Sequence, residues 1–270
     1  MKDKIICGDN VTELKKFPDD LIDLTVTSPP YDNLRDYEWY SFDFENLAKE
    51  LFRVTKDGGV VVWVVGDSVK NGSESGTSFK QALYFNAIGF NLHDTMIYHR
   101  NNPPLTHNRY EQHFEYMFVL SKGKPKTFNP ITELKSYHDK RTKKMTRRNA
   151  DNSIDYGYCK QSLTKIKGNV WYYKVGGGLS TKDKIAFKHP AIFPEELVKD
   201  HIISWSNEGD LVLDPFAGSG TTLKMAKLLN RNYIGIELSE KYCEIIKKRL
   251  EKYNNHKLES FEKLLEAGEK

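Results

Sequence analysis

A glycine-rich stretch of nine residues, Asp214–Thr222 (DPFAGSGTT), constrains the fold of this chain more than any other feature. It lies between an apolar run, Leu211–Leu213, and a helix-like stretch that begins near Thr221. Glycine allows a tight turn between a strand and a helix, and it lets backbone N–H groups at the helix start approach a ligand. The pattern predicts a strand, a ligand-binding turn and a helix within an α/β fold.

An acidic residue, Glu237, ends the next apolar run, 233–236. A carboxylate at the end of a strand beside such a turn can accept hydrogen bonds from both hydroxyls of a ribose, so the pair predicts nucleoside binding. A P-loop would carry Lys before its last Thr, and a dinucleotide fingerprint would need a third glycine; neither is present. S-adenosylmethionine, which has an adenosine and a sulfonium but no phosphate, fits better. The structural alternative is a glycine turn that binds nothing.

The second element, TSPPY at 27–31, follows another apolar run. Pro29 and Pro30 fix the backbone and lack N–H donors, so the segment presents mainly hydrogen-bond acceptors. An exocyclic amine of a nucleobase is a poor nucleophile because its lone pair is delocalised, and acceptors for its N–H groups favour a pyramidal nitrogen. We expect Ser28 Oγ and the Pro29 carbonyl to accept these bonds and Tyr31 to stack on the base. A proline-stiffened strand end is the alternative.

Positive charge is concentrated in Lys122–Lys188, which holds 17 basic and 5 acidic residues, whereas the rest of the chain holds 24 basic and 32 acidic residues. A polyanion would bind there. Trp171–Tyr173 is expected to belong to the core of this insertion. One run of basic side chains suits phosphate contacts, namely Lys140, Arg141, Lys143, Lys144, Arg147 and Arg148.

The order of these motifs resembles that of the β-class amino-group DNA methyltransferases. The resemblance implies a Rossmann-like α/β sheet with a circularly permuted motif order: a catalytic half at 1–121, a basic target recognition segment at 122–188 and a cofactor-binding half at 189–270. It also implies double-stranded DNA as partner, with the target base flipped out of the duplex. His113 and Glu115 are expected to share a strand face and to have a structural or base-pocket role.

Gly8–Asn10 and His189–Pro194 match the same family. By this resemblance, Asp9 would meet the adenine edge of S-adenosylmethionine, and the segment opened by His189 and Pro190 would line its methionine end. The implied cofactor site consists of Asp9, Asn10, His189, Pro190, Phe193, Asp214, Pro215, Phe216, Gly218, Ser219, Gly220, Thr221 and Glu237.

The acceptor base depends on Ser28. Ser at this position resembles enzymes that act on cytosine N4, whereas adenine N6 enzymes usually carry Asp or Asn. Cytosine C5 methylation needs a Cys thiolate, and no cysteine of this chain follows a proline. We expect site-specific N4-cytosine methylation, with a restriction endonuclease as a candidate partner. Adenine N6, an RNA or protein amide substrate, and a DNA-binding module with a degenerate cofactor site are the alternatives.

Cys7, Cys159 and Cys243 are far apart in the sequence and form no CxxC pair. This pattern favours a reduced, cytoplasmic protein without structural zinc or another metal site. The family resemblance implies a prokaryotic or phage origin. The N-terminus has no apolar signal region and no stretch is long enough to span a membrane. We expect a monomer or homodimer. The Gly- and Ser-rich polar loop at 66–78 has no packing reason to be ordered.

Overall fold

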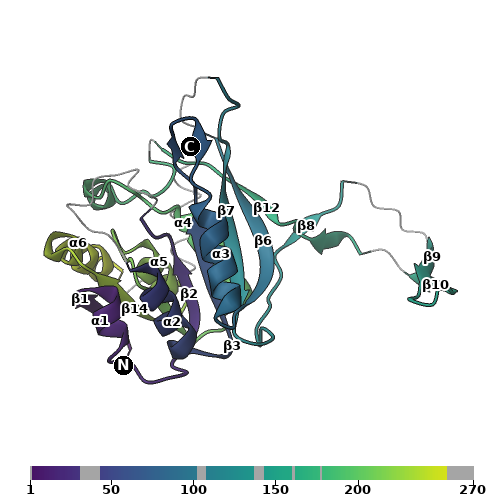
Figure 1. Cartoon of the computed structure of the whole chain (residues 1–270), viewed down its shortest axis with the longest axis horizontal. Coiled ribbons are helices and arrows are strands. Elements are labelled where there is room, and N and C mark those ends of the chain that lie inside the picture. Colours follow the sequence, from purple (N-terminus) through teal and green to yellow (C-terminus); the bar gives the residue numbers. More distant parts are fainter. Residues whose placement is uncertain are drawn as a thin grey trace. The chain divides into compact units, whose positions relative to one another are not determined.

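The computed structural model describes residues 2–30, 43–101, 108–136, 143–159, 162–176 and 178–253. The chain divides into two compact units (Figure 1). The larger unit comprises Met1–Asn129 and Asn169–Lys270, and the smaller unit comprises Pro130–Gly168. No helix among the described residues is long and apolar enough to cross a membrane.

An eight-stranded sheet forms the centre of the larger unit. Its neighbours pair in parallel, except that β7 is antiparallel to both β3 and β6. In spatial order the strands are β1 (Lys4–Cys7), β14 (Asn232–Glu237), β13 (Leu211–Asp214), β2 (Ile22–Thr27), β3 (Thr55–Val65), β7 (Phe114–Ser121), β6 (Asn91–Arg100) and β12 (Val170–Tyr173).

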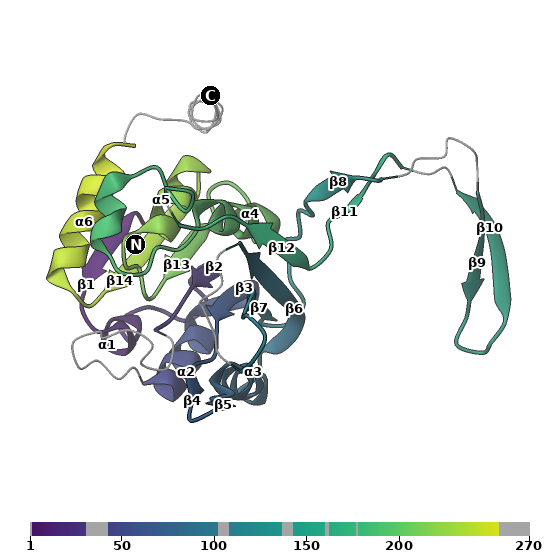
Figure 2. The same ribbon diagram turned by 90° about the horizontal axis from the view of Figure 1, so that it is seen from above.

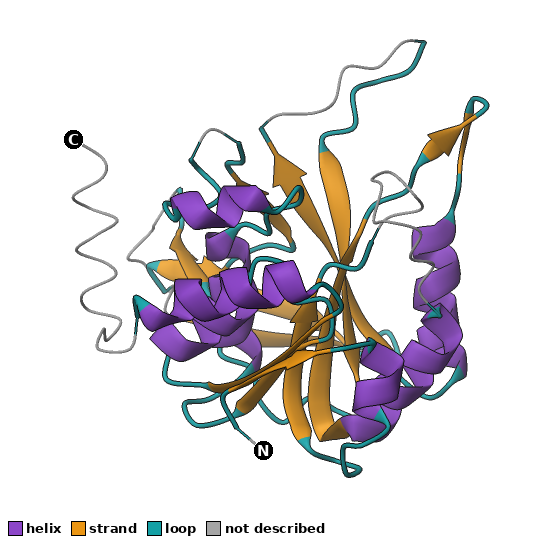
Figure 3. Ribbon diagram, turned by 90° about the vertical axis from the view of Figure 1, so that its left-hand side faces the viewer, coloured by secondary structure: helices purple, strands orange, loops and turns teal. Residues whose placement is uncertain are grey.

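Helices cover both faces of this sheet (Figure 3). Residues 60–65 of β3 are therefore buried throughout, as their unbroken apolar run predicts. The start of α2 is set by Asp43, whose side chain accepts a hydrogen bond from Asn46 N. The helices are α1 (Asn10–Leu14), α2 (Phe44–Val54), α3 (Thr77–Ala87), α4 (Glu195–Trp205), α5 (Thr221–Leu228) and α6 (Glu240–Glu251), with a 3-10 helix, η1 (Lys184–Lys188).

The parallel strands β13 and β2 flank a topological switch point of the sheet. From β13 the chain continues to β14 on one side, whereas from β2 it continues to β3 on the other side. In open α/β sheets, ligands bind outside the carboxyl ends of the strands at such a switch point. The motifs at 27–31 and 214–222 both follow the strands that flank it.

The smaller unit is shorter than the predicted insertion, 122–188. Residues 122–129 and 169–188 belong to the larger unit. Within the second of these segments, β12 pairs in parallel with β6 and extends the main sheet. Trp171 and Tyr173 are buried there, so the prediction that they belong to the core of the insertion is wrong.

The described residues of the smaller unit include two antiparallel pairs of strands (Figure 2). One pair joins β8 (Thr132–Leu134) to β11 (Thr164–Ile166), and the other joins β9 (Lys143–Arg148) to β10 (Ile154–Cys159).

The polar loop at 66–78 is ordered, contrary to expectation. It contains a short hairpin of β4 (Val69–Lys70) and β5 (Ser73–Glu74). Asp67 accepts hydrogen bonds from Ser75 Oγ and Ser78 N, and Arg109 donates to Gly72 O at 2.9 Å. These side-chain bonds supply the order that apolar packing does not.

Candidate functional site

A cavity of about 1330 Å³ opens at the carboxyl ends of β1, β2, β13 and β14. It brings both predicted motifs together although they lie far apart in the sequence. Asp9 and Gly220 do not line it, and Tyr31 lies outside the described residues. The predicted site residues that line it are Asn10, Ser28, Pro29, Pro30, His189, Pro190, Phe193, Asp214, Pro215, Phe216, Gly218, Ser219, Thr221 and Glu237.

The glycine-rich turn requires glycine at two positions. Gly218 has φ 53° and Gly220 has φ 80°, values in the left-handed region. A Cβ on Gly218 would lie 3.2 Å from the His189 ring, and a Cβ on Gly220 would lie 2.8 Å from the Ile246 side chain. Gly220 therefore shapes the start of α5 behind the cavity, while Gly218 forms part of the cavity wall.

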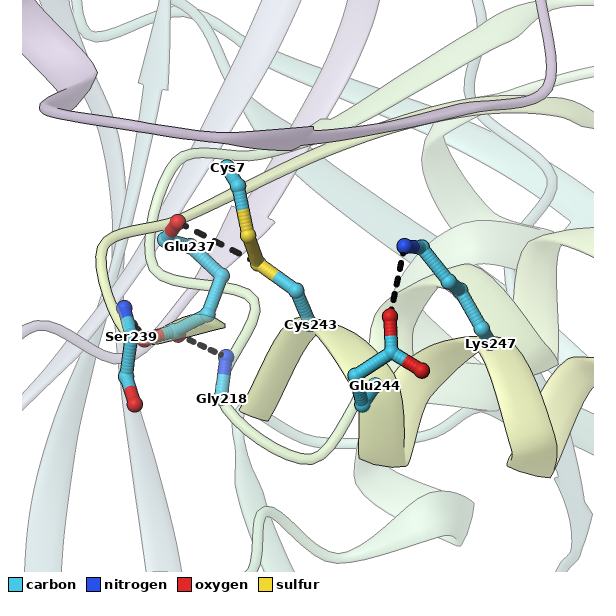
Figure 4. Close-up of a disulfide and its surroundings, with 7 residues drawn as sticks. All are labelled: Cys7, Gly218, Glu237, Ser239, Cys243, Glu244 and Lys247. Atoms are coloured by element: carbon cyan, nitrogen blue, oxygen red, sulfur yellow. Dashed lines mark hydrogen bonds and ion pairs between the residues drawn. A yellow bond between two sulfur atoms is a disulfide. The ribbon is translucent and has the colours of Figure 1, made fainter. Parts of the chain in front are cut away.

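The Glu237 carboxylate is fixed at the cavity by two backbone donors. Its Oε2 accepts a 2.7 Å bond from Gly218 N, and its Oε1 accepts a 2.9 Å bond from Ser239 N (Figure 4). Burial raises the pKa of Glu237, and these N–H bonds partly oppose that shift. The carboxylate is held as an acceptor beside the glycine turn.

Asp214 lines the cavity and connects the two motifs. Its Oδ1 accepts bonds from Thr27 Oγ1 at 2.7 Å and from Phe216 N at 3.0 Å. Burial raises the pKa of Asp214, while hydrogen bonds from Thr27 and Thr222 act in the opposite direction. The end of β2 and the turn after β13 are therefore tied to one carboxylate.

Asp9 and Asn10 have different positions. The Asp9 side chain caps α1, accepting bonds from Thr12 N at 2.9 Å and Thr12 Oγ1 at 2.8 Å. Asn10 lines the cavity, and its Nδ2 donates to Pro215 O at 3.3 Å. The start of α1 is thereby attached to the glycine-rich turn.

His189 lies between the glycine turn and α6. Its ring centroid is 4.4 Å from that of Tyr242, and its Nδ1 is 2.6 Å from Ala191 O. Together with the close approach to Gly218, these contacts fix the imidazole in the cavity wall, so the ring shapes the cavity.

The same cavity continues past Ser28 along β6 and β7. Arg100 Nη1 forms a 2.9 Å ion pair with Glu115 Oε1, and both residues line this part together with Phe114 and Tyr116. His113 directly precedes β7 and does not line the cavity, whereas Glu115 lies within β7 and lines it. The sequence carries no motif that would have found Arg100.

A buried ionic network, also missed from the sequence, supports the glycine turn. Arg249 Nη1 donates to Ser219 O at 2.9 Å and to Thr221 Oγ1 at 3.0 Å. Asp183 Oδ2 lies 2.9 Å from both Arg249 Nε and Lys224 Nζ. Burial raises the pKa of Asp183, but the Lys224 charge and the donated hydrogen bonds outweigh it and lower that pKa to about 2. Glu195 completes the network.

Cys7 and Cys243 form a disulfide beside Glu237 (Figure 4), which corrects the expectation of three reduced, distant cysteines. Their Cα atoms are 6.2 Å apart although 236 residues separate them. The pairing follows from topology: β1 lies parallel to β14 with Cys7 opposite Glu237, and α6 begins directly after β14. Among the described residues, no group of three or more His, Cys, Asp or Glu could hold a metal ion.

The predicted phosphate-binding residues lie in the smaller unit. Lys143, Lys144, Arg147 and Arg148 belong to β9, and the side chains of the last three are exposed. Lys140 and Arg141 lie outside the described residues.

Comparison with known proteins gives consistent matches. A family model described as DNA methylase matches residues 22–248. The orphan methyltransferase M.BamHII of Bacillus amyloliquefaciens is 58% identical over 238 residues, 86% of this chain and 89% of that protein. A crystal structure of a proposed DNA modification methylase from Thermus thermophilus is 25% identical with a TM-score of 0.63, covering 93% of this chain and 95% of that one.

A second structure of the Thermus protein holds S-adenosyl-L-methionine. The cytosine-N4-specific PvuII DNA methyltransferase shares the fold, with a TM-score of 0.66 at 20% identity over 96% of this chain and 90% of that chain.

Proposed function

This chain belongs to the DNA methylase family of N6 and N4 amino-group methyltransferases, and on that basis we propose that it methylates the N4 amine of cytosine in a specific sequence of duplex DNA. S-adenosylmethionine is the methyl donor of this family. The observation that carries the proposal is one cavity that contains both Ser28-Pro29 and the Glu237 carboxylate beside the glycine turn.

The glycine side of the cavity suits S-adenosylmethionine. Glu237 presents a fixed carboxylate, which would accept hydrogen bonds from the ribose hydroxyls. Asn10 and Phe216 line the same part, with His189 and Phe193 beside them. When bound, the cofactor supplies a methyl group carried on a cationic sulfonium. Acidic side chains are compatible with this ligand because it carries no phosphate.

Ser28 and Pro29 would act on the target amine. The Ser28 hydroxyl and the Pro29 carbonyl accept its hydrogen bonds, which favours a pyramidal nitrogen with an available lone pair. Pro30 stiffens this backbone. The residues Arg100, Phe114 and Glu115 line the adjoining part of the cavity, which is the proposed place for the flipped base. Tyr31 is proposed to stack on that base.

The choice of cytosine depends on the serine at position 28. The alternative within the family is adenine N6, and the alternative outside enzymes is a DNA-binding module without cofactor. The test is incubation of the purified chain with S-adenosylmethionine and mixed-sequence duplex DNA, followed by digestion to nucleosides and mass spectrometry. N4-methylcytosine is expected. If N6-methyladenine is the only methylated nucleoside, the acceptor is adenine N6 and not cytosine N4. If calorimetry shows no binding of S-adenosylmethionine, the chain is better explained as a DNA-binding module without cofactor.

The basic segment 122–188, with the compact unit 130–168 inside it, is proposed to recognise the target sequence. Its lysines and arginines would neutralise DNA phosphates in a salt-dependent way. A cognate restriction endonuclease is a further proposed partner, although the relative M.BamHII is described as an orphan. A cytoplasmic monomer or homodimer stays a prediction.

A further inference from the structure

The strands β9 and β10 form an antiparallel ribbon with two chemically different faces. Residues directly opposite each other in such a pair point to the same side, and side chains alternate along each strand. Lys144 lies opposite Tyr158, Thr146 opposite Tyr156 and Arg148 opposite Ile154. These six residues form one face, which we name the tyrosine face. Met145, Arg147, Asp155 and Gly157 belong to the opposite face.

Side-chain contacts agree with this assignment. Lys144 Nζ lies 4.3 Å from the centroid of the Tyr156 ring, which places both residues on the same side. Tyr156 is 62% exposed and Tyr158 is 76% exposed. Two exposed tyrosines on one face of a two-stranded ribbon favour a bound partner.

Charge separates the two faces further. The tyrosine face carries Lys144 and Arg148 and no acidic residue. On the opposite face, Arg147 is directly opposite Asp155, whose carboxylate also accepts a 3.0 Å hydrogen bond from Asn149. A polyanion is therefore attracted more strongly to the tyrosine face.

We infer that this ribbon enters the major groove of duplex DNA with its tyrosine face toward the base edges. The inference rests on the proposed function and deepens it by naming the residues that read sequence. The groove is about 12 Å wide and admits a two-stranded ribbon. Lys144 and Arg148 are suited to the O6 and N7 acceptors of guanine, whereas Arg147 points away from the bases and adds only to non-specific attraction.

Adjacent arginines supply a matched test, because Arg148→Ala and Arg147→Ala remove the same side chain and charge from opposite faces. Methylation rates are measured for the preferred duplex and for each of its single base-pair variants at fixed salt. Arg148→Ala is expected to reduce discrimination at one base position by roughly tenfold or more. Arg147→Ala is expected to reduce the methylation rates of all these duplexes by a common factor. Equal effects of the two variants, or altered preference in Arg147→Ala only, would overturn the inference.

Calorimetry with S-adenosylmethionine gives a folding control, since the cofactor site belongs to the larger unit and both variants should bind normally. If the unmodified chain methylates no duplex, the proposed function fails separately. The same three proteins are then compared by selection of bound duplexes from a random library. A sequence preference that Arg148→Ala loses and Arg147→Ala keeps supports the ribbon assignment. A preference equally kept or lost by both contradicts it.

Discussion

The Thr27 hydroxyl donates a 2.7 Å hydrogen bond to the Asp214 carboxylate across 187 residues of sequence. It connects the strand that ends in Ser28-Pro29 to the strand that begins the glycine-rich turn. The proposed reaction requires both segments to keep their positions. Removing this bond therefore tests whether it holds the Ser28-Pro29 segment and the glycine-rich turn together.

Thr27→Val is expected to destabilise the protein by about 1–3 kcal/mol, because it leaves a buried carboxylate oxygen short of a donor. Urea unfolding measures the change in free energy. Thr25→Val is the matched control: it lies on the same strand, and its Oγ1 is buried without a hydrogen-bond partner among the described residues. That variant should be neutral or more stable. Equal losses in both variants would show that the bond to Asp214 contributes little.

Gly220→Ala is expected to lower both stability and cofactor affinity, because the added Cβ meets Ile246 at 2.8 Å in a backbone with φ 80°. Gly209→Ala separates the two causes. Gly209 has φ 84°, but nothing lies within 4 Å of its Cβ position, so it reports backbone strain alone. Thermal unfolding and calorimetry with S-adenosylmethionine measure both effects. If Gly220→Ala loses no more stability than Gly209→Ala, the contact with Ile246 does not contribute to the effect.

The affinity for S-adenosylmethionine is expected to fall on acidification because Glu237 must be ionised to accept the ribose hydroxyls. Burial raises the pKa of Glu237, so the loss begins above the ordinary value of 4.5. Calorimetry across pH measures the profile. Glu237→Gln should bind weakly with little of this dependence, whereas Glu244→Gln, on the exposed side of α6, should keep it. A pH-dependent profile retained in Glu237→Gln would contradict the assignment.

Asp183→Asn is expected to destabilise the protein by about 3–5 kcal/mol at neutral pH, because it leaves Lys224 and Arg249 buried with one carboxylate fewer. The folded-state pKa of Asp183 is lowered from 3.8 to about 2. Its contribution is therefore present above pH 3.8 and lost as the pH falls toward 2. The free energy of unfolding is measured for Asp183→Asn and for the unmodified chain across this pH range. The difference between the two free energies should become smaller as the pH falls. A constant difference would argue against the ionised network.

Features that depend on local sequence could be predicted. The turn at 214–222 follows from glycines between an apolar run and a helical pattern, and α2 matches the apolar spacing of 44–54. The position of Glu237 at the end of its strand follows from the same pattern.

Features that depend on distant partners could not be predicted. From the sequence, Arg249 would be expected to be a solvent-exposed residue of a charged helix. It is buried because α6 packs against the glycine turn. The aromatic run Trp171–Tyr173 favours a strand but does not show that this strand pairs with β6. The Cys7–Cys243 pair likewise depends on the register of β1 with β14.

We propose that this chain methylates cytosine N4 in one sequence context through the Ser28-Pro29 segment. The most direct measurement is methylation-sensitive sequencing of DNA from cells that express the chain, with cells expressing Ser28→Ala as the control. We expect N4-methylcytosine at one recurring motif and its strong reduction in the Ser28→Ala cells. Methylation found only on adenine, or an unchanged level in the Ser28→Ala cells, would contradict it.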